Sequence, residues 1–262
     1  MLRRAAVVVA LVALPLGAAA CGGGKKTPTT TTASASDAMQ TVVAAAKKTA
    51  AAGSMRITVR AGTTTSSEHV LVAGTGAFDT PNHKGELRLR FTAGPIASTM
   101  DVVLDGESIY LRSPLFSILL PAGKSWIKID ATKAGSVGGV NLSSLLSQDP
   151  SAALDALAKN TTSVTQLGTA TVGGLTTTHY RAQASGTSGS TKAAGVYNVW
   201  VGSDGYIHRV RTVAAAASSG SKVASVTATS NLSGFGDTVD VTVPPASQTY
   251  ETKNGTIPGL GG

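Results

Sequence analysis

The sequence predicts an α+β fold in which a large curved antiparallel β-sheet carries helices over its concave face. Short runs of alternating apolar and polar residues recur along most of the chain, which is typical of strands with one buried face. Turn sequences such as Asp105-Gly106 separate the runs, and strands joined by tight hairpins are antiparallel. Two helical segments interrupt the strands, and a sheet this large has to curl.

The first element is a helix at residues 37–52. Asp37 can cap it, with Gln40 as the capping-box partner three residues later, and Gly53 ends it. Apolar residues at helical spacing form one stripe, which consists of Met39, Val42, Val43, Ala46 and Ala50.

Strands follow in hairpin order. The run at 86–91 places Leu87, Leu89 and Phe91 on one face and charged residues on the other. Asp105-Gly106 predicts a type I′ hairpin that pairs the strand of Met100, Val102 and Leu104 with the strand of Ile109 and Leu111. We interpret Gly74 and Gly76, inside a strand pattern, as marking a bulge or a bend.

A second helix begins at Asp149-Pro150, where the aspartate can cap and proline suits the first helical position. Strands then resume with a Gly173-Gly174 turn, and a last short strand at 241–243 closes the domain. The count is roughly ten or eleven strands in all.

The N-terminus has the order of a secretory signal peptide, residues 1–20. Two arginines precede an apolar run and small residues, and the run is too short to span a membrane as a helix. Cys21, the one cysteine, follows directly. This arrangement resembles a bacterial lipobox, which implies lipidation of Cys21, and two acyl chains suffice for stable anchoring. The alternative is a plain secreted protein with a stray thiol.

Three further segments complete the predicted organisation. Residues 21–36 are the lipidated cysteine and a flexible tether rich in Gly, Thr and Ser, residues 37–250 form one domain, and residues 251–262 form a flexible tail. Loss of Arg3 and Arg4 lowers the formal net charge from +8 to +6. Scattered basic residues and few aromatics argue against a nucleic-acid partner.

No enzymatic signature is found. The four histidines lack metal-ligand spacing, and the chain contains no G-x-S-x-G elbow. We therefore predict no catalytic residue, no metal and no cofactor, with a hydrolase of unrecognised site as the weakest alternative.

Several stretches together resemble the actinobacterial lipid-carrying lipoproteins of the LppX/LprG type, relatives of the LolA and LolB carriers. They are GTGAFD at 74–79, DGESIYLRSP at 105–114, GKSWIKID at 123–130, DPSAALDALA at 149–158 and GGLTTTHYRA at 173–182. The resemblance covers about residues 37–250 and implies a half-barrel enclosing an apolar cavity for acyl chains. It also implies a membrane-anchored, extracytoplasmic protein that moves or presents a lipid or glycolipid, with envelope transport proteins as partners.

Composition is compatible with a cavity, because Ala, Thr, Val and Gly outnumber large side chains, and small side chains on a wide sheet would leave a void that costs stability unless filled. Composition alone does not decide between a cavity and a solid core, and it is the resemblance that favours the cavity. The alternative is that helices pack the sheet solid. The predicted lining residues, each of which is equally suited to an ordinary core, are Leu87, Leu89, Phe91, Met100, Val102, Leu104, Ile109 and Leu111.

The loop SPLFSILLPAG is too apolar to be fully exposed to solvent. Either it caps the core or it forms a lip at the cavity mouth that touches membrane, through Leu115, Phe116, Ile118, Leu119 and Leu120. The leading functional hypothesis is a lipid-binding lipoprotein. Its rival is a ligand-free surface or sensor module that recruits a protein partner.

Overall fold

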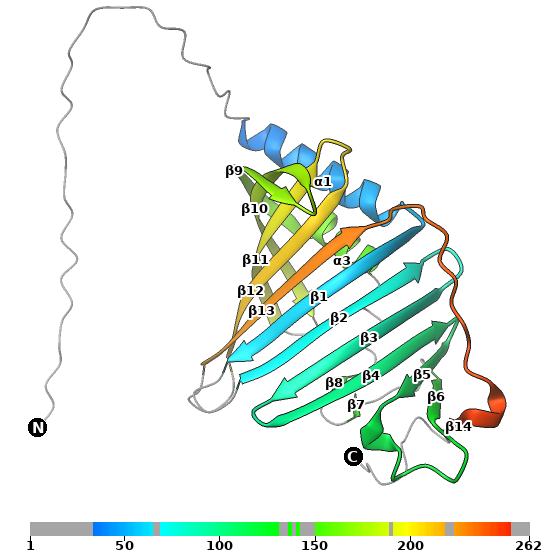
Figure 1. Ribbon diagram of the computed structural model, residues 1–262. Coiled ribbons are helices and arrows are strands. Elements are labelled where there is room, and N and C mark those ends of the chain that lie inside the picture. Colours follow the sequence, from blue (N-terminus) through cyan, green and yellow to red (C-terminus); the bar gives the residue numbers. More distant parts are fainter. Residues whose placement is uncertain are drawn as a thin grey trace, which may run out of the picture. The chain divides into compact units, whose positions relative to one another are not determined.

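The computed structural model describes residues 34–64, 69–130, 136–137, 140–141, 150–188, 191–217 and 223–252. All of them belong to one compact unit, Ala33–Gly262. Twelve strands form one curved sheet in the order β14-β6-β5-β4-β3-β2-β1-β13-β12-β11-β10-β9 (Figure 1). The predicted large antiparallel sheet is therefore confirmed. Its bounds are β1 Ser54–Thr64, β2 His69–Asp79, β3 Lys84–Ala93, β4 Ile96–Asp105, β5 Ser108–Arg112, β6 Trp126–Asp130, β9 Thr161–Val172, β10 Leu175–Ser188, β11 Thr191–Gly202, β12 Ile207–Ala217, β13 Val223–Ser233 and β14 Thr249–Glu251.

The chain order explains most of this topology, since hairpin neighbours pair along β1 to β6 and along β9 to β13. The long-range pairing of β1 with β13 joins these two series into one sheet. A separate two-stranded sheet pairs β7 (Ser136–Val137) with β8 (Val140–Asn141).

The predicted hairpin at Asp105-Gly106 exists, but its turn type differs. Asp105 pairs with Ser108, so Gly106 and Glu107 are the central residues. Gly106 has a φ of +58°, whereas the only described non-glycine residue with positive φ is His83. Glycine at the first central position is the signature of a type II′ turn. The Gly173-Gly174 turn has positive φ at both glycines, as type I′ requires.

The first helix, α1 (Ala35–Ala50), begins two residues earlier than predicted. Ser34 rather than Asp37 is the N-cap, because the Ser34 hydroxyl accepts a hydrogen bond from the Asp37 backbone N–H. Asp37 instead lies in the first turn, where the helix dipole favours an anion. The second helix, α3 (Pro150–Asn160), has proline at its first position as predicted; Asp149 lies outside the described residues.

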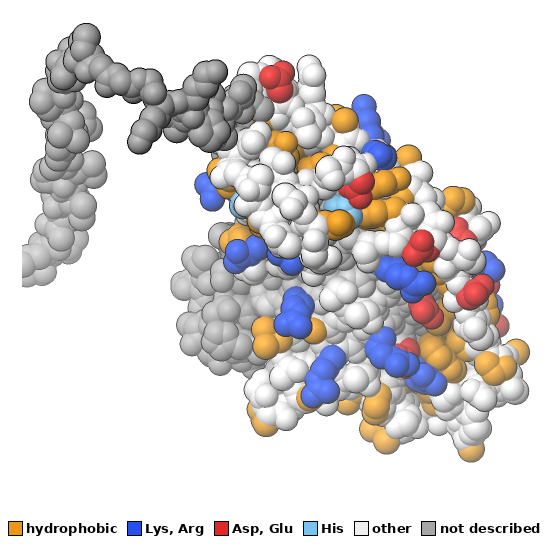
Figure 2. All heavy atoms as spheres, turned by 45° about the horizontal axis from the view of Figure 1, so that its top comes forward, with side chains coloured by type: hydrophobic (Ala, Val, Ile, Leu, Met, Phe, Trp, Pro, Cys, Tyr) orange, Lys and Arg blue, Asp and Glu red, His pale blue; other side chains and the backbone are white. Residues whose placement is uncertain are grey.

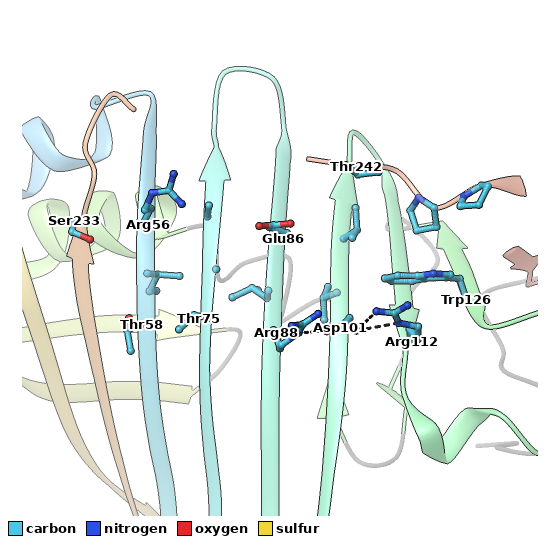
Figure 3. A pocket seen from close by; sticks show the side chains of 18 residues that line it. Arg56, Thr58, Thr75, Glu86, Arg88, Asp101, Arg112, Trp126, Ser233 and Thr242 are labelled. Carbon is cyan, nitrogen blue, oxygen red and sulfur yellow. Dashed lines mark hydrogen bonds and ion pairs between the residues drawn. The ribbon is translucent and has the colours of Figure 1, made fainter. Parts of the chain in front are cut away.

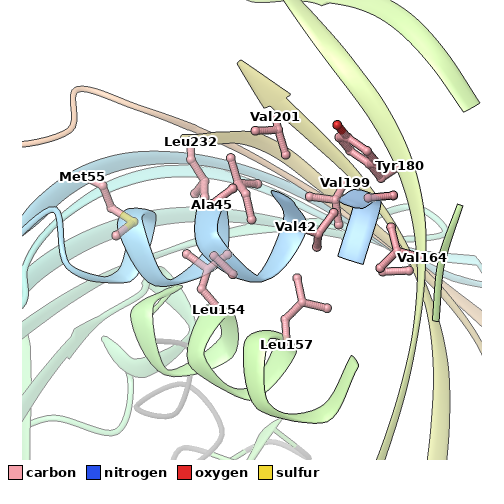
Figure 4. Close-up of a cluster of buried hydrophobic side chains, with 14 residues drawn as sticks. Val42, Ala45, Met55, Leu154, Leu157, Val164, Tyr180, Val199, Val201 and Leu232 are labelled. Atoms are coloured by element: carbon pink, nitrogen blue, oxygen red, sulfur yellow. The ribbon is translucent and has the colours of Figure 1, made fainter. Parts of the chain in front are cut away.

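Both helices pack on the same sheet face, over strands β9–β12 (Figure 4). We call β9–β13 with α1 and α3 the helix half. Its buried cluster mixes helix and strand residues, and alanines on α1 let the helices approach closely. The cluster contains Ala38, Val42, Ala45, Ala46, Met55, Leu154, Leu157, Val164, Tyr180, Ala182, Val199, Val201, Ile207 and Leu232. Within the described chain the helices thus cover one half of this face.

Strands β2–β6 with residues 113–120 form what we call the loop half. Its buried cluster on the same face consists of Phe78, Leu87, Leu89, Met100, Val102, Ile109, Leu111, Phe116, Ile127 and Ile129. Ile57 of β1 packs against both clusters, so the two cores are continuous along one face.

The segment after β13 returns across the opposite face of the sheet. The predicted strand at 241–243 is wrong: Val241 packs on Val103, Tyr110 and Trp126 instead. Two prolines follow at once and cannot donate hydrogen bonds to a strand partner. The edge position is taken by β14, which pairs parallel with β6 and includes Glu251.

Candidate functional site

The eight predicted lining residues all lie in the loop half and face the same side. Six of them are buried members of its cluster, and Phe91 and Leu104 pack against it partly exposed. The strand register explains this arrangement, since Leu89 pairs with Met100 and Val102 pairs with Leu111. Their role as cavity lining stays a prediction.

Sequence reasoning missed three further members of this face. Ile127 and Ile129 of β6 are fully buried, and Phe78 closes the cluster from β2. The alternation in the strand sequence WIKID carried the signal for the two isoleucines. No charged side chain of β2–β6 points to this face, because the charged positions of each strand alternate with the buried ones.

Gly74 and Gly76 shape the loop half in a way that was not predicted. The register of β2 with β1 and β3 runs without interruption, so there is no bulge at either glycine. A Cβ at Gly74 would lie 2.6 Å from Leu89 Cδ2, and one at Gly76 would lie 2.7 Å from Leu87 Cδ2. The glycines therefore leave room for two leucines of β3 to lean over β2.

The apolar loop packs partly on the core, and its role as a lip at a cavity mouth stays a prediction. Its short helix η1 (Pro114–Phe116) buries Phe116 against the loop-half cluster, and Leu120 packs there too. In contrast, Leu115 is 60% exposed and Ile118 is 88% exposed. Leu119 is half-buried. One side of the loop thus covers the apolar face while the other side presents leucine and isoleucine outward.

The opposite face of the loop half holds a pocket of about 680 Å³ (Figure 3). Strands β1–β6 form its floor, and Thr242, Pro244 and Pro245 of the returning segment border it. Asp101 lines this pocket and accepts hydrogen bonds from Arg88 Nε at 2.8 Å and from Arg112 Nη2 at 2.6 Å. The Arg112 guanidinium also lies over the Trp126 ring, 4.6 Å from its centroid.

Charge pairing dominates the electrostatics of this pocket. Burial acts to raise the pKa of Asp101, but the hydrogen bonds and charges of Arg88 and Arg112 outweigh it and hold the pKa below its usual value. The hydrogen bond to Asp101 raises the pKa of Arg88. A carboxylate that is already paired with two arginines is a poor general base, so this arrangement supports structure rather than acid–base chemistry.

Two of the histidines, His179 and His208, make structural contacts. His179 stacks on Trp200 at 4.2 Å between ring centroids, and His208 lies 2.9 Å from Asp204 Oδ2. Burial acts to raise the pKa of Asp204, but hydrogen bonds from the Tyr206 backbone and from His208 lower it overall. The described residues contain no cluster of three or more His, Cys, Asp or Glu able to hold a metal ion.

Cys21 and the predicted signal peptide lie outside the described residues. Among the helices that are described, none combines the length and apolarity needed to cross a bilayer.

No protein-family model matches the chain, and no curated protein matches it. Solved structures do. The crystal structure of the Mycobacterium tuberculosis lipoprotein LppX matches with a TM-score of 0.50 at 15% identity, over 79% of this chain and 99% of LppX. LprF from Mycobacterium bovis matches with a TM-score of 0.48 at 13% identity, over 80% of this chain and 97% of LprF. At the level of fold, the resemblance inferred from the sequence is thus confirmed: the chain has the fold of the lipoprotein LppX.

Proposed function

We propose that this chain is a non-catalytic lipoprotein that binds the acyl chains of a lipid or glycolipid on the helix-side face of its loop half and carries or presents them in the cell envelope. One observation supports this above the others. Five adjacent strands present a continuous aliphatic face without a charged side chain, and the described chain covers it with a short apolar loop. Acyl chains bind to apolar surfaces with few polar groups.

The N-terminal segments supply the location in this proposal. Residues 1–20 direct export, Cys21 is lipidated, and the segment between Cys21 and α1 tethers the domain to the outer side of the membrane. A tether of about 13 residues reaches at most about 45 Å, so the domain stays within reach of the bilayer. Mass spectrometry of intact protein from a native membrane tests this part, since replacing Cys21 with serine removes the acyl mass.

Acyl-chain binding is tested by placing a large side chain on the apolar face of the loop half, where it would occupy the proposed ligand site. Val72 packs against the loop-half cluster and Val210 packs against the helix-half cluster, and both are only partly buried. We expect Val72→Trp to weaken binding of a fluorescent fatty acid about 30-fold, because the indole displaces two or three methylene groups worth about 0.8 kcal/mol each. The matched control Val210→Trp should bind as the parent does.

Two results would count against the proposal. One is a parent protein that shows no saturable fatty-acid binding and yields no lipid after gentle purification, which favours a ligand-free module that recruits a protein. The other is equal weakening by both tryptophan variants, which would place the ligand outside the loop half. Thermal melting of each variant separates lost binding from lost folding.

A further inference from the structure

The arginine side chains of this sheet all lie on one of its two faces. All eight arginines of the described residues lie on the face opposite the helices, because each occupies a strand position that alternates with buried ones. Figure 2 shows basic side chains spread across this face and acidic ones gathered to one side. Strands β1 and β9–β13 contain no Asp or Glu at all.

Four of these arginines form a row across the strands. The register Arg181↔Asn198↔Arg211↔Thr229↔Arg60↔Ala73↔Arg90 places one arginine on every second strand from β10 to β3. Strands lie about 4.8 Å apart, so the arginines are about 10 Å apart and the row is about 29 Å long. All four side chains are exposed, and none forms an ion pair with another described residue.

A set of exposed apolar side chains borders the arginine row at one end of the sheet. Val196, Val213 and Leu71 lie two residues farther along their strands than the row does, on the same face. Ile96 begins β4 at that end, and Ser113, just before η1, lies beside Ser98 of β4. The apolar rim therefore consists of Leu71, Ile96, Leu115, Ile118, Val196 and Val213, all of which are exposed.

A merely solvated face is a poor explanation for this arrangement. Other cations on the same face of the loop half are neutralised: Arg88 and Arg112 pair with Asp101, and Lys84 lies 3.7 Å from Asp105. The arginine row has no such partners among the described residues, and its neighbours in register are Asn, Thr and Ala. Unpaired guanidinium groups in a row are suited to phosphate, which they bind through two parallel hydrogen bonds.

The spacing of row and rim matches the layering of a membrane surface. Two residues of strand separate them by about 6.6 Å, comparable to the roughly 5–10 Å by which apolar side chains enter the boundary between headgroups and acyl chains. Both the row and the rim run across the strands, so they lie parallel to a bilayer when the strands stand steeply on it.

We propose that this end of the sheet docks on a bilayer that contains anionic phospholipid, with the apolar rim in the interface and Arg60, Arg90, Arg181 and Arg211 at the level of the phosphates. The docking does not depend on bound acyl cargo. It fixes the orientation of the domain on the membrane and brings the loop of Leu115 and Ile118 into contact with lipid.

The test uses the full chain with Cys21→Ser, so that no acyl anchor holds it, and vesicles of phosphatidylcholine with or without phosphatidylglycerol. In this background Arg60→Gln/Arg211→Gln is compared with Lys47→Gln/Lys159→Gln, which removes the same charge from the two helices. We expect binding to phosphatidylglycerol vesicles to fall about 30-fold for the arginine pair, since each basic residue near the surface contributes about fivefold. The lysine pair should stay within about twofold of the parent by that reasoning.

A second arm tests the rim. Leu71→Ser/Ile118→Ser should weaken vesicle binding while leaving the dependence on phosphatidylglycerol unchanged, because it removes apolar insertion and no charge. Equal losses for the arginine and lysine pairs would overturn the proposal in favour of unspecific charge attraction. Arginine-dependent binding of soluble dextran sulfate without binding to vesicles would also overturn the proposal. It would identify a soluble polyanion as the ligand of the arginine row. Fatty-acid binding by the same variants should be unchanged, so docking and cargo binding can fail separately.

Discussion

The helix half and the loop half share one sheet face but close it in different ways. In the helix half, α1 and α3 contribute their own side chains to the core, and small residues such as Ala45 and Ala182 let helix and strand come close. In the loop half, the strands supply Leu, Ile and Met, and the cover among the described residues is Phe116 and Leu120. A face into which helices pack their own side chains is suited to stability, and we therefore place the proposed ligand on the loop half.

The largest loss of stability in this comparison is expected when a substitution creates a cavity in the core of the helix half. Leu154 of α3 is 3% exposed, and we expect Leu154→Ala to lower the free energy of unfolding by about 3 kcal/mol, measured by chemical denaturation. Leu104→Ala is the matched truncation in the loop half. Because Leu104 is only partly buried, its cost should be about 1 kcal/mol. Equal costs would mean that both halves are packed alike.

A buried hydrogen bond couples α1 to strand β12 in the helix half. The buried Thr49 hydroxyl accepts from the Ile207 backbone N–H at 2.9 Å and donates to the Ala45 carbonyl at 2.7 Å. Thr49→Ala leaves the buried N–H of Ile207 without an acceptor, so we expect a loss of about 2 kcal/mol in unfolding free energy. Thr49→Ser keeps the hydroxyl and should recover most of that loss. A serine variant as unstable as the alanine variant would assign the effect to packing of the methyl group instead.

In the loop half, the corresponding test is to replace a glycine that lies close to a neighbouring strand. A Cβ at Gly76 would overlap the Glu86 carbonyl oxygen, which belongs to a neighbouring strand and cannot move freely. We expect Gly76→Ala to cost about 2 kcal/mol in thermal or chemical unfolding. At Gly62 the nearest atom would be Leu71 Cδ2 at 3.1 Å, the end of an exposed side chain. Gly62→Ala should therefore be neutral or slightly stabilising; a similar loss at both sites would rule out close strand approach as the cause.

Local pattern was sufficient to predict much of this molecule. The period of two in residues such as Leu87 and Leu89 fixed the strands and the face that they bury, and Gly173-Gly174 fixed a hairpin. Helix and strand ends were less accurate where two residues compete for one role, as Ser34 and Asp37 do for the N-cap. The strand predicted at 241–243 failed because tertiary packing of Val241 on Trp126 outweighs its strand propensity.

Properties that arise between distant segments could not be read from the sequence. The pairing of β1 with β13 sets the register that aligns Arg60 with Arg211, and no local signal encodes it. Composition alone does not tell where small side chains lie. Ala45 and Ala182 lie where helices and sheet meet. If the sheet has room for a ligand, it is beside the large aliphatic residues of the loop half.

The smallest expected change in stability concerns Asp101, on the opposite face of the loop half. Because the folded-state pKa of Asp101 is lowered, the stability that its pairing provides is present above the unfolded pKa of about 3.9 and is lost as pH falls through the lower, folded value. Its side chain is 22% exposed, and we expect Asp101→Asn to cost about 1 kcal/mol near neutral pH. Urea unfolding of parent and variant between about pH 7 and pH 2 should show their stabilities converging in acid. A difference that stays constant with pH would mean that the amide disturbs packing between Arg88 and Arg112, and that the ion pairs contribute nothing to the stability of the strands beneath the apolar face.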